Sequence, residues 1–140
     1  MFVLDASVLL ALLLGESGAQ QVAAVVRGAE MSIVNLCEVV ARLSEGGADP
    51  GAVYGIAISY GVRVQAFREA HAIEVARLRP LTRHLGLSLG DRTCLAQGRF
   101  SALPILTADA RMASADIGLD IRMIRSPWRV PLLSSRPCSP

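Results

Sequence analysis

Short apolar runs alternate along this chain with longer stretches in which apolar residues recur at helical spacing. Four of the short runs have the pattern of buried strands, at residues 2–4, 62–64, 103–106 and 121–124. Helical spacing occurs at residues 8–14, 19–27, 33–43, 50–60, 69–84 and 89–100, with a short helix from residue 110. Short strands that alternate with helices indicate an α/β fold built around a parallel sheet.

Several of these helices have recognisable starts and ends. Ser32 and Ser88 are suitable N-cap residues, and Asp49 followed by Pro50 places a cap before a proline at the first helical position. Pro80 interrupts the stretch 69–84 and predicts either two helices or a kink, because proline lacks the amide hydrogen that a helix interior needs.

Four acidic residues stand among apolar neighbours rather than in solvated charge runs: Asp5, Glu38, Asp91 and Asp109. Asp5 and Asp109 follow predicted strands, and open α/β sheets bind their ligands at the carboxyl ends of the strands. Asp91 falls in the first turn of a helix, where the helix dipole favours negative charge. Because a charge in apolar surroundings is costly unless it is paired or placed on a metal, we expect these carboxylates to converge.

Glu38 is the member of this set that lies well inside a predicted helix. Ser32, Asn35 and Glu38 are spaced by three residues and share one polar face of a helix that is otherwise apolar. A polar stripe of this kind indicates a helix that lines a cleft. We therefore expect Asn35 to support the same site.

Carboxylate oxygens are the ligands that Mg²⁺ and Mn²⁺ prefer. We expect Asp5 and Asp91 to hold such an ion, with Glu38 and Asp109 contributing directly or through water. A divalent ion lowers the pKa of bound water and neutralises charge on an attacked phosphate. The set therefore suggests a phosphodiesterase site, with the choice between one and two ions left open.

The composition excludes several other classes of function. All 14 basic residues are arginine, and the absence of lysine excludes a Walker P-loop and every Schiff-base mechanism. The net charge of +2 gives no strong electrostatic argument for nucleic acid, while 52% hydrophobic residues predict a surface partly buried in a partner. Cys37, Cys94 and Cys138 show no paired spacing, which argues against a disulfide framework or a zinc site. We expect Cys37 and Cys94 to be small buried side chains.

The two ends of the sequence lead to predictions about localisation and domain boundaries. No signal-peptide pattern precedes Asp5, and the apolar run 8–14 is too short to span a bilayer, so we expect a cytoplasmic protein without membrane association. One domain is predicted over residues 1–125, followed by a flexible tail rich in proline and serine over residues 126–140.

Five segments occur in a characteristic order between about residue 2 and residue 125: FVLDASVLLALLLGE, SIVNLCEVVARL, GLSLGDRTCLAQG, LPILTADARM and GLDIRMIR. Together they resemble PIN-domain proteins of the bacterial VapC toxin type, and LSLGDRTCLA is the most specific of the matching motifs. The resemblance implies a PIN-like fold, in which a short parallel sheet of about four to five strands is flanked by helices.

The same resemblance implies a metal-dependent ribonuclease that cleaves RNA internally with Mg²⁺ or Mn²⁺. It places the family's acidic residues on Asp5, Glu38, Asp91 and Asp109. Ser7 matches the small hydroxyl residue of the first motif, and Thr107 the one before the last acid. Three partners are also implied: an RNA substrate, a cognate antitoxin that neutralises the toxin, and a second copy in a homodimer.

Two alternatives remain open from the sequence. A catalytically inactive PIN module would only bind RNA or protein, although the complete acidic set argues against it. In the second alternative, Asp109 is a turn or cap residue and does not take part in the site, because relatives vary at this position and Asp116 lies nearby. A phosphotransfer domain with Asp5 as nucleophile is disfavoured, because Ser7 occupies the place of its second acid and lysine is absent.

Overall fold

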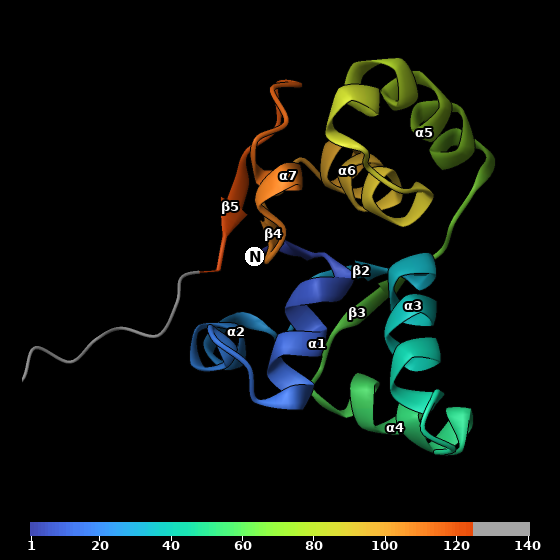
Figure 1. Cartoon of the computed structure of the whole chain (residues 1–140), viewed down its shortest axis with the longest axis vertical. Helices are drawn as coiled ribbons and strands as arrows, with labels where there is room; N and C mark the ends of the chain where they lie inside the picture. The colour runs from blue at the N-terminus through green and yellow to red at the C-terminus, as the bar shows by residue number, and fades with distance from the viewer. Residues whose placement is uncertain (125–140) are drawn as a thin grey trace, which may run out of the picture.

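The computed structural model describes residues 1–124, so the predicted tail over residues 126–140 lies outside the described part of the chain. At its centre is a five-stranded sheet with the order β3-β2-β1-β4-β5 (Figure 1). The strands are β1 (Val3–Leu4), β2 (Glu30–Ser32), β3 (Arg63–Gln65), β4 (Ile105–Thr107) and β5 (Ile121–Met123). Every neighbouring pair is parallel, which confirms the predicted α/β class.

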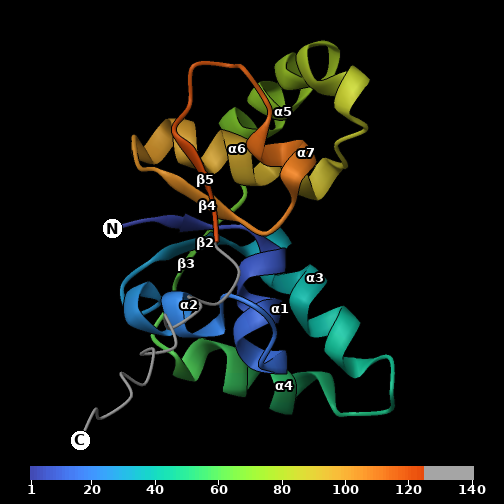
Figure 2. The same cartoon turned by 60° about the vertical axis from the view of Figure 1, so that its left-hand side comes forward.

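Helices cover both faces of this sheet. They are α1 (Ala6–Leu14), α2 (Ala19–Val25), α3 (Ile33–Ser44), α4 (Pro50–Ser59), α5 (Glu69–Thr82), α6 (Leu89–Ser101) and α7 (Ala110–Ala113), with a 3-10 turn, η1 (Arg83–Leu85), between α5 and α6. Figures 1 and 2 show α1 to α4 on one side of the sheet and α5, α6 and α7 on the other. Parallel strands require such crossover connections, and the crossovers supply both layers.

The two helical layers enclose two apolar cores. Because successive side chains of a strand point to opposite faces, Leu4 packs into the core beneath α1 and α3, while Val3 packs into the core beneath α5 and α6. Both side chains are fully buried. A strand of only two residues is therefore anchored from both sides, and it delivers the next residue, Asp5, to a defined position.

The strand β2 is not predicted by the sequence pattern. Its three residues Glu30, Met31 and Ser32 contain one apolar side chain and lack the apolar run or alternation that identifies a strand. It forms because Met31 is fully buried and because the segment pairs with β1 on one side and β3 on the other. Long-range pairing, rather than local pattern, creates this strand.

The sequence predicts that Pro80 gives two helices or a kink in the stretch 69–84. In the structure, α5 continues through Pro80 to Thr82, and the separate 3-10 helix η1 follows directly. Another expectation needs correction. Cys37 was expected to be buried and is exposed, whereas Cys94 is fully buried as predicted.

Within residues 1–124, no single helix combines the length and the apolar character needed to cross a membrane; α1 and α2 reach them only together, as a pair bent by 111°.

Candidate active site

Asp5 lies where β1 ends, against the neighbouring strand β4. Its amide donates a hydrogen bond to the carbonyl of Leu106 (3.0 Å), and the residue is only 3% exposed. Asp5 occupies the N-cap position of α1, yet its side chain does not cap that helix. Instead, Oδ2 accepts hydrogen bonds from Ser7 Oγ (2.7 Å) and Thr107 Oγ1 (3.1 Å). The carboxylate is thus oriented by hydroxyl groups from two different elements.

The direction of these two hydroxyl groups is set by the backbone that follows β4. The amide of Ala108 donates to Ser7 Oγ (3.0 Å), and the amide of Asp109 donates to Thr107 Oγ1 (3.0 Å). Because each oxygen accepts from an amide, its own hydrogen is available for Asp5. The ends of β1 and β4 are joined in this way, and Asp109 is carried beside Asp5.

Asp91 is held at the N-terminus of α6 by a reciprocal capping interaction with Ser88. The Ser88 amide donates to Asp91 Oδ2 (2.8 Å), and the Asp91 amide donates to Ser88 Oγ (3.1 Å). Such a capping box satisfies backbone groups that the helix start leaves without partners. The carboxylate of Asp91 is consequently fixed at the helix end that favours negative charge.

Glu38 reaches the same region from α3, where this helix packs closely against α6. The fully buried Asn35 donates from Nδ2 to Glu38 Oε2 (3.2 Å) and to the carbonyl of Gly90 (2.9 Å). A Cβ atom on Gly90 would overlap the Glu38 carboxylate. Asn35 and Gly90 therefore place Glu38 next to Asp91, which is the role that the polar stripe on this helix suggested for Asn35.

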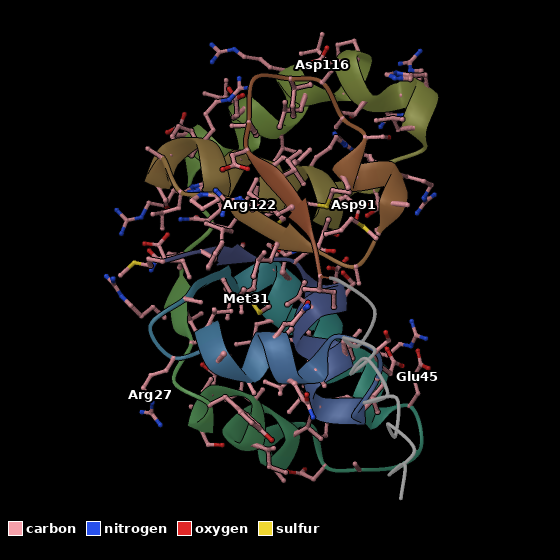
Figure 3. The ribbon with its side chains drawn as sticks, turned by 90° about the vertical axis from the view of Figure 1, so that its left-hand side faces the viewer. Arg27, Met31, Glu45, Asp91, Asp116 and Arg122 are labelled. Atoms are coloured by element: carbon pink, nitrogen blue, oxygen red, sulfur yellow. The ribbon has the colours of Figure 1, made fainter. Side chains whose placement is uncertain are left out.

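The four predicted acids surround one cavity of about 250 Å³, here called the acidic cavity. Its lining consists of Asp5, Ala6, Ser7, Leu10, Glu38, Arg42, Asp91 and Asp109. Asp116, which the sequence left open as an alternative to Asp109, is not part of this lining. Figure 3 shows Asp116 well away from Asp91, on the far side of α7 and β5.

The carboxylates in this cavity influence each other electrostatically. Burial raises the pKa of Asp5 above its ordinary value, and the charge of Asp91 raises it further, against the hydrogen bond from Ser7. Desolvation likewise raises the pKa of Glu38, with added repulsion from Asp5 and Asp91. Repulsion of this kind requires carboxylates that lie close together.

Asp109 differs from the other acids because it already has a cationic partner. Arg111 donates to both of its oxygens, from Nε to Oδ1 (3.3 Å) and from Nη2 to Oδ2 (3.0 Å), and Oδ1 also caps α7 by accepting from the Arg111 amide (2.8 Å). These hydrogen bonds lower the pKa of Asp109. The alternative of a cap residue thus describes the observed geometry, although Asp109 also lines the acidic cavity.

Sequence reasoning gave no role to Arg111 or to Gly90. The available signals were local: Arg111 stands two residues after an acid, at a spacing suited to a bidentate pair, and Gly90 interrupts the start of a helix directly before Asp91. Neither signal identifies the partner, because Gly90 meets Glu38 from a segment more than 50 residues away.

The donor set of the cavity suits a divalent cation, although its arrangement is not that of a closed metal site. Among residues 1–124, no three His, Cys, Asp or Glu side chains converge closely enough to hold one ion. The hydrogen bonds described above use one oxygen each of Asp5, Glu38 and Asp91, and the second oxygen lies outside them. Hard oxygen donors that repel each other fit Mg²⁺ or Mn²⁺, which would draw them together.

The sequence matches the family model of the PIN domain over residues 2–118. The chain therefore belongs to the PIN-domain family, and the predicted PIN-like fold is confirmed. No curated protein sequence matches the chain.

Solved structures with the same fold include toxin proteins of three bacteria. A toxin-antitoxin complex from Klebsiella pneumoniae matches with a TM-score of 0.70 and 18% identity, covering 91% of this chain and 100% of the other. VapC20 from Mycobacterium tuberculosis, a toxin that cleaves the sarcin-ricin loop, matches with a TM-score of 0.69 and 18% identity over 85% and 96% of the two chains. VapBC2 from Rickettsia felis, bound to a DNA fragment from its promoter, matches with a TM-score of 0.67 and 12% identity over 87% and 97%. At these identities the likeness establishes the fold.

Proposed function

We propose that this protein is a metal-dependent endoribonuclease of the VapC toxin type. The observation that carries the proposal is the convergence of Asp5, Glu38, Asp91 and Asp109 on one cavity, within a fold shared with toxins of this kind. These acids come from four separate elements, and burial, together with repulsion among the carboxylates, raises the pKa of Asp5 and Glu38. A structural role alone does not explain why such a costly arrangement persists.

In the proposed mechanism, Asp5 and Asp91 would hold Mg²⁺ or Mn²⁺, and Glu38 and Asp109 would contribute directly or through water. When bound, the ion would supply positive charge to the scissile phosphate and lower the pKa of a bound water. Ser7 and Thr107 keep the Asp5 carboxylate oriented, which preserves the geometry that catalysis requires. Glu38 Oε1 lies outside the hydrogen bond to Asn35 and could accept a proton from the attacking water.

We also propose that a cognate antitoxin neutralises the enzyme by docking in an apolar groove. This groove of about 530 Å³ is lined by Ile33, Leu36, Cys37, Val40, Ala41, Pro50 and Tyr54. It runs along α3, the helix that carries Glu38, so a bound partner would lie beside the acidic cavity. Among the related structures is a toxin-antitoxin complex, which supports a partner of this class.

The proposed setting is the cytoplasm, with the protein acting as a homodimer. Among residues 1–124, thirteen large apolar side chains are exposed, including Ile56, Ile73 and Leu81, and a second copy would cover part of this surface. Light scattering of the purified protein would report a dimeric mass if the proposal is correct and a monomeric mass if it is not.

The test is cleavage of a panel of structured RNAs by the wild-type protein and by three matched variants. Asp5→Asn and Asp91→Asn remove one charge from the acidic cavity, while Asp116→Asn makes the same change at an exposed position outside it. We expect cleavage with Mg²⁺ or Mn²⁺ by the wild type and Asp116→Asn, none in chelator, and a loss of at least about 100-fold in the other two. Full cleavage by Asp5→Asn would refute the catalytic role of the acidic cavity, and a wild type that cleaves no RNA with either ion would favour the inactive binding module.

A further inference from the structure

A second cavity with a basic lining adjoins the acidic cavity at the start of α6. It has a volume of about 470 Å³ and is lined by Arg79, Arg83, Gly86, Leu87, Ser88, Leu89 and Arg92. These residues come from the end of α5, from η1 and the turn after it, and from the first turn of α6. Figure 1 shows α5 and α6 together on one side of the sheet. We refer to this cavity as the arginine pocket. Its lining contains three guanidinium groups and no carboxylate.

Within residues 1–124, four arginines form ion pairs: Arg77, Arg99, Arg111 and Arg122. None of the three arginines of the pocket is among them. Three unpaired cations around one cavity repel each other, and the remedy for such repulsion is an anion between them.

Arg92 provides the strongest sign of a missing ligand. The residue is only 8% exposed, and its Nη1 donates to the carbonyl of Val75 (3.0 Å). Its Nε is buried and has no hydrogen-bond partner. A buried guanidinium is costly unless a negative charge and hydrogen bonds compensate it. Because the described residues supply no such charge, the pocket is built for an anion from outside.

The arginine pocket and the acidic cavity share a wall. Ser88 lines the pocket and exchanges two hydrogen bonds with Asp91, which lines the cavity. Arg111, which pairs with Asp109, has its Nη1 3.7 Å from the position of a Cβ on Gly86, at the edge of the pocket. Asp91 and Arg92 are consecutive in α6 and therefore point to different sides of the helix. An anion in the pocket would therefore lie beside the start of α6, the same helix start that carries Asp91.

We propose that the arginine pocket binds a backbone phosphate of the RNA, next to the phosphate that is cleaved in the acidic cavity. This inference rests on the proposed ribonuclease function and extends it to the path of the substrate. A polymer with one phosphate in each nucleotide presents an anion beside the scissile group whatever its sequence. Arginine forks suit phosphate oxygens, and the N-terminus of α6 adds a favourable dipole.

The test uses a fluorescein-labelled single-stranded RNA of mixed sequence, with chelator present so that the RNA stays intact. The double variant Arg79→Gln/Arg83→Gln is compared with Arg27→Gln/Arg63→Gln, which removes the same charge at the β3 edge of the sheet (Figure 3 shows Arg27). All four side chains are exposed, so both proteins should fold, which circular dichroism will verify.

We expect the pocket variant to bind this RNA about 10-fold more weakly than the control variant. The slope of log affinity against log salt should fall by about 0.7 for each phosphate that no longer meets an arginine. Equal binding by the two variants, or an unchanged slope, would overturn the proposal. Competition with tripolyphosphate and with hexaglutamate separates two classes of anion. If the pocket variant keeps its RNA affinity and loses only hexaglutamate binding, the pocket serves an acidic protein segment and the proposal is wrong.

The outcome also distinguishes this inference from the proposed function. If the wild type cleaves RNA with Mn²⁺ and the pocket variant binds and cleaves equally well, only the phosphate pocket is refuted. If the wild type neither binds nor cleaves any RNA, the ribonuclease function fails and the phosphate pocket fails with it.

Discussion

Gly90 leaves the space that the carboxylate of Glu38 occupies. A Cβ atom at position 90 would overlap Glu38 Oε1, while the Gly90 carbonyl accepts a hydrogen bond from Asn35, which also holds Glu38. The position of the Glu38 carboxylate therefore depends on the absence of a side chain at position 90. Because the obstructing atoms belong to the end of a flexible side chain, a Cβ here would displace the carboxylate and leave both backbones in place.

Replacing Gly90 with alanine should separate stability from activity. Alanine favours a helix over glycine by up to about 1 kcal/mol, and by less in the first turn where Gly90 stands, so the free energy of unfolding should stay equal or rise slightly. RNA cleavage should fall by about 100-fold, because a misplacement of about 1 Å in a catalytic group costs that much. Chemical denaturation and a cleavage assay would measure the two effects.

Gly55→Ala is the matched control for this substitution. Gly55 lies inside α4, and a Cβ there would meet no atom within 4 Å. It should gain similar helix stability and keep full activity. Equal activity in both variants would show that the position of Glu38 does not matter for cleavage.

Acid repulsion predicts how stability changes with pH in the absence of a metal ion. Burial and the neighbouring charge of Asp91 raise the pKa of Asp5, so the folded protein holds that proton more tightly than the unfolded chain does. The stabilising effect of the protonated form is complete below the unfolded pKa and is lost as the pH rises through the folded one. Asp5→Asn should therefore become more stable relative to the wild type as the pH rises from about 4 to about 8.

Thermal unfolding in chelator would measure this difference at each pH. Asp116→Asn, at an exposed position outside the acidic cavity, should follow the wild type over the whole range. The explanation is wrong if Asp5→Asn loses stability relative to the wild type as the pH rises, because Asp5 would then be stabilised by its charge.

A divalent cation should restore the stability that the wild-type protein loses through repulsion among its charged carboxylates. Binding to the folded state alone stabilises a protein by about 2.7 kcal/mol when the ligand is at 100 times its dissociation constant. Mn²⁺ or Mg²⁺ should therefore raise the melting temperature of the wild type and have little effect on Asp5→Asn or Asp91→Asn. A similar rise in all three proteins would place the bound ion outside the acidic cavity.

Arg111 should compete with the cation for Asp109. Arg111→Gln frees the Asp109 carboxylate from its bidentate pair, which occupies the oxygens that the ion would use. Mn²⁺ affinity should rise by about 2- to 5-fold, measured by calorimetry. Arg122→Gln is the matched control, because Arg122 pairs with Asp120 at the same spacing and geometry away from the cavity.

An unchanged affinity in Arg111→Gln would show that Asp109 contributes nothing to the ion. An increase in both arginine variants would instead reflect a general change in protein charge. Only an increase confined to Arg111→Gln supports a role for Asp109 at the metal.

Local sequence patterns, namely capping residues and apolar runs, were sufficient to predict most of the fold. Helix boundaries followed from caps that act within three residues, such as Ser32, whose hydroxyl accepts from the Val34 amide, and Asp49, which accepts from the Ala52 amide. Strands were predicted where apolar residues are consecutive. The strand at Glu30–Ser32 was missed because its reason to exist is pairing with two other strands, which no local pattern reveals.

In the candidate site, too, some features follow from local sequence and others only from tertiary packing. The sequence by itself determined which residues carry carboxylates and at which strand and helix ends they stand, because those positions depend on interactions between near neighbours. Only the tertiary structure decided that Glu38 lies over Gly90, that Arg111 neutralises Asp109, and that Arg92 is buried without a counter-charge. These relationships depend on how α3, α5 and α6 pack on the sheet, and packing is the sum of many weak contacts between segments distant in the chain.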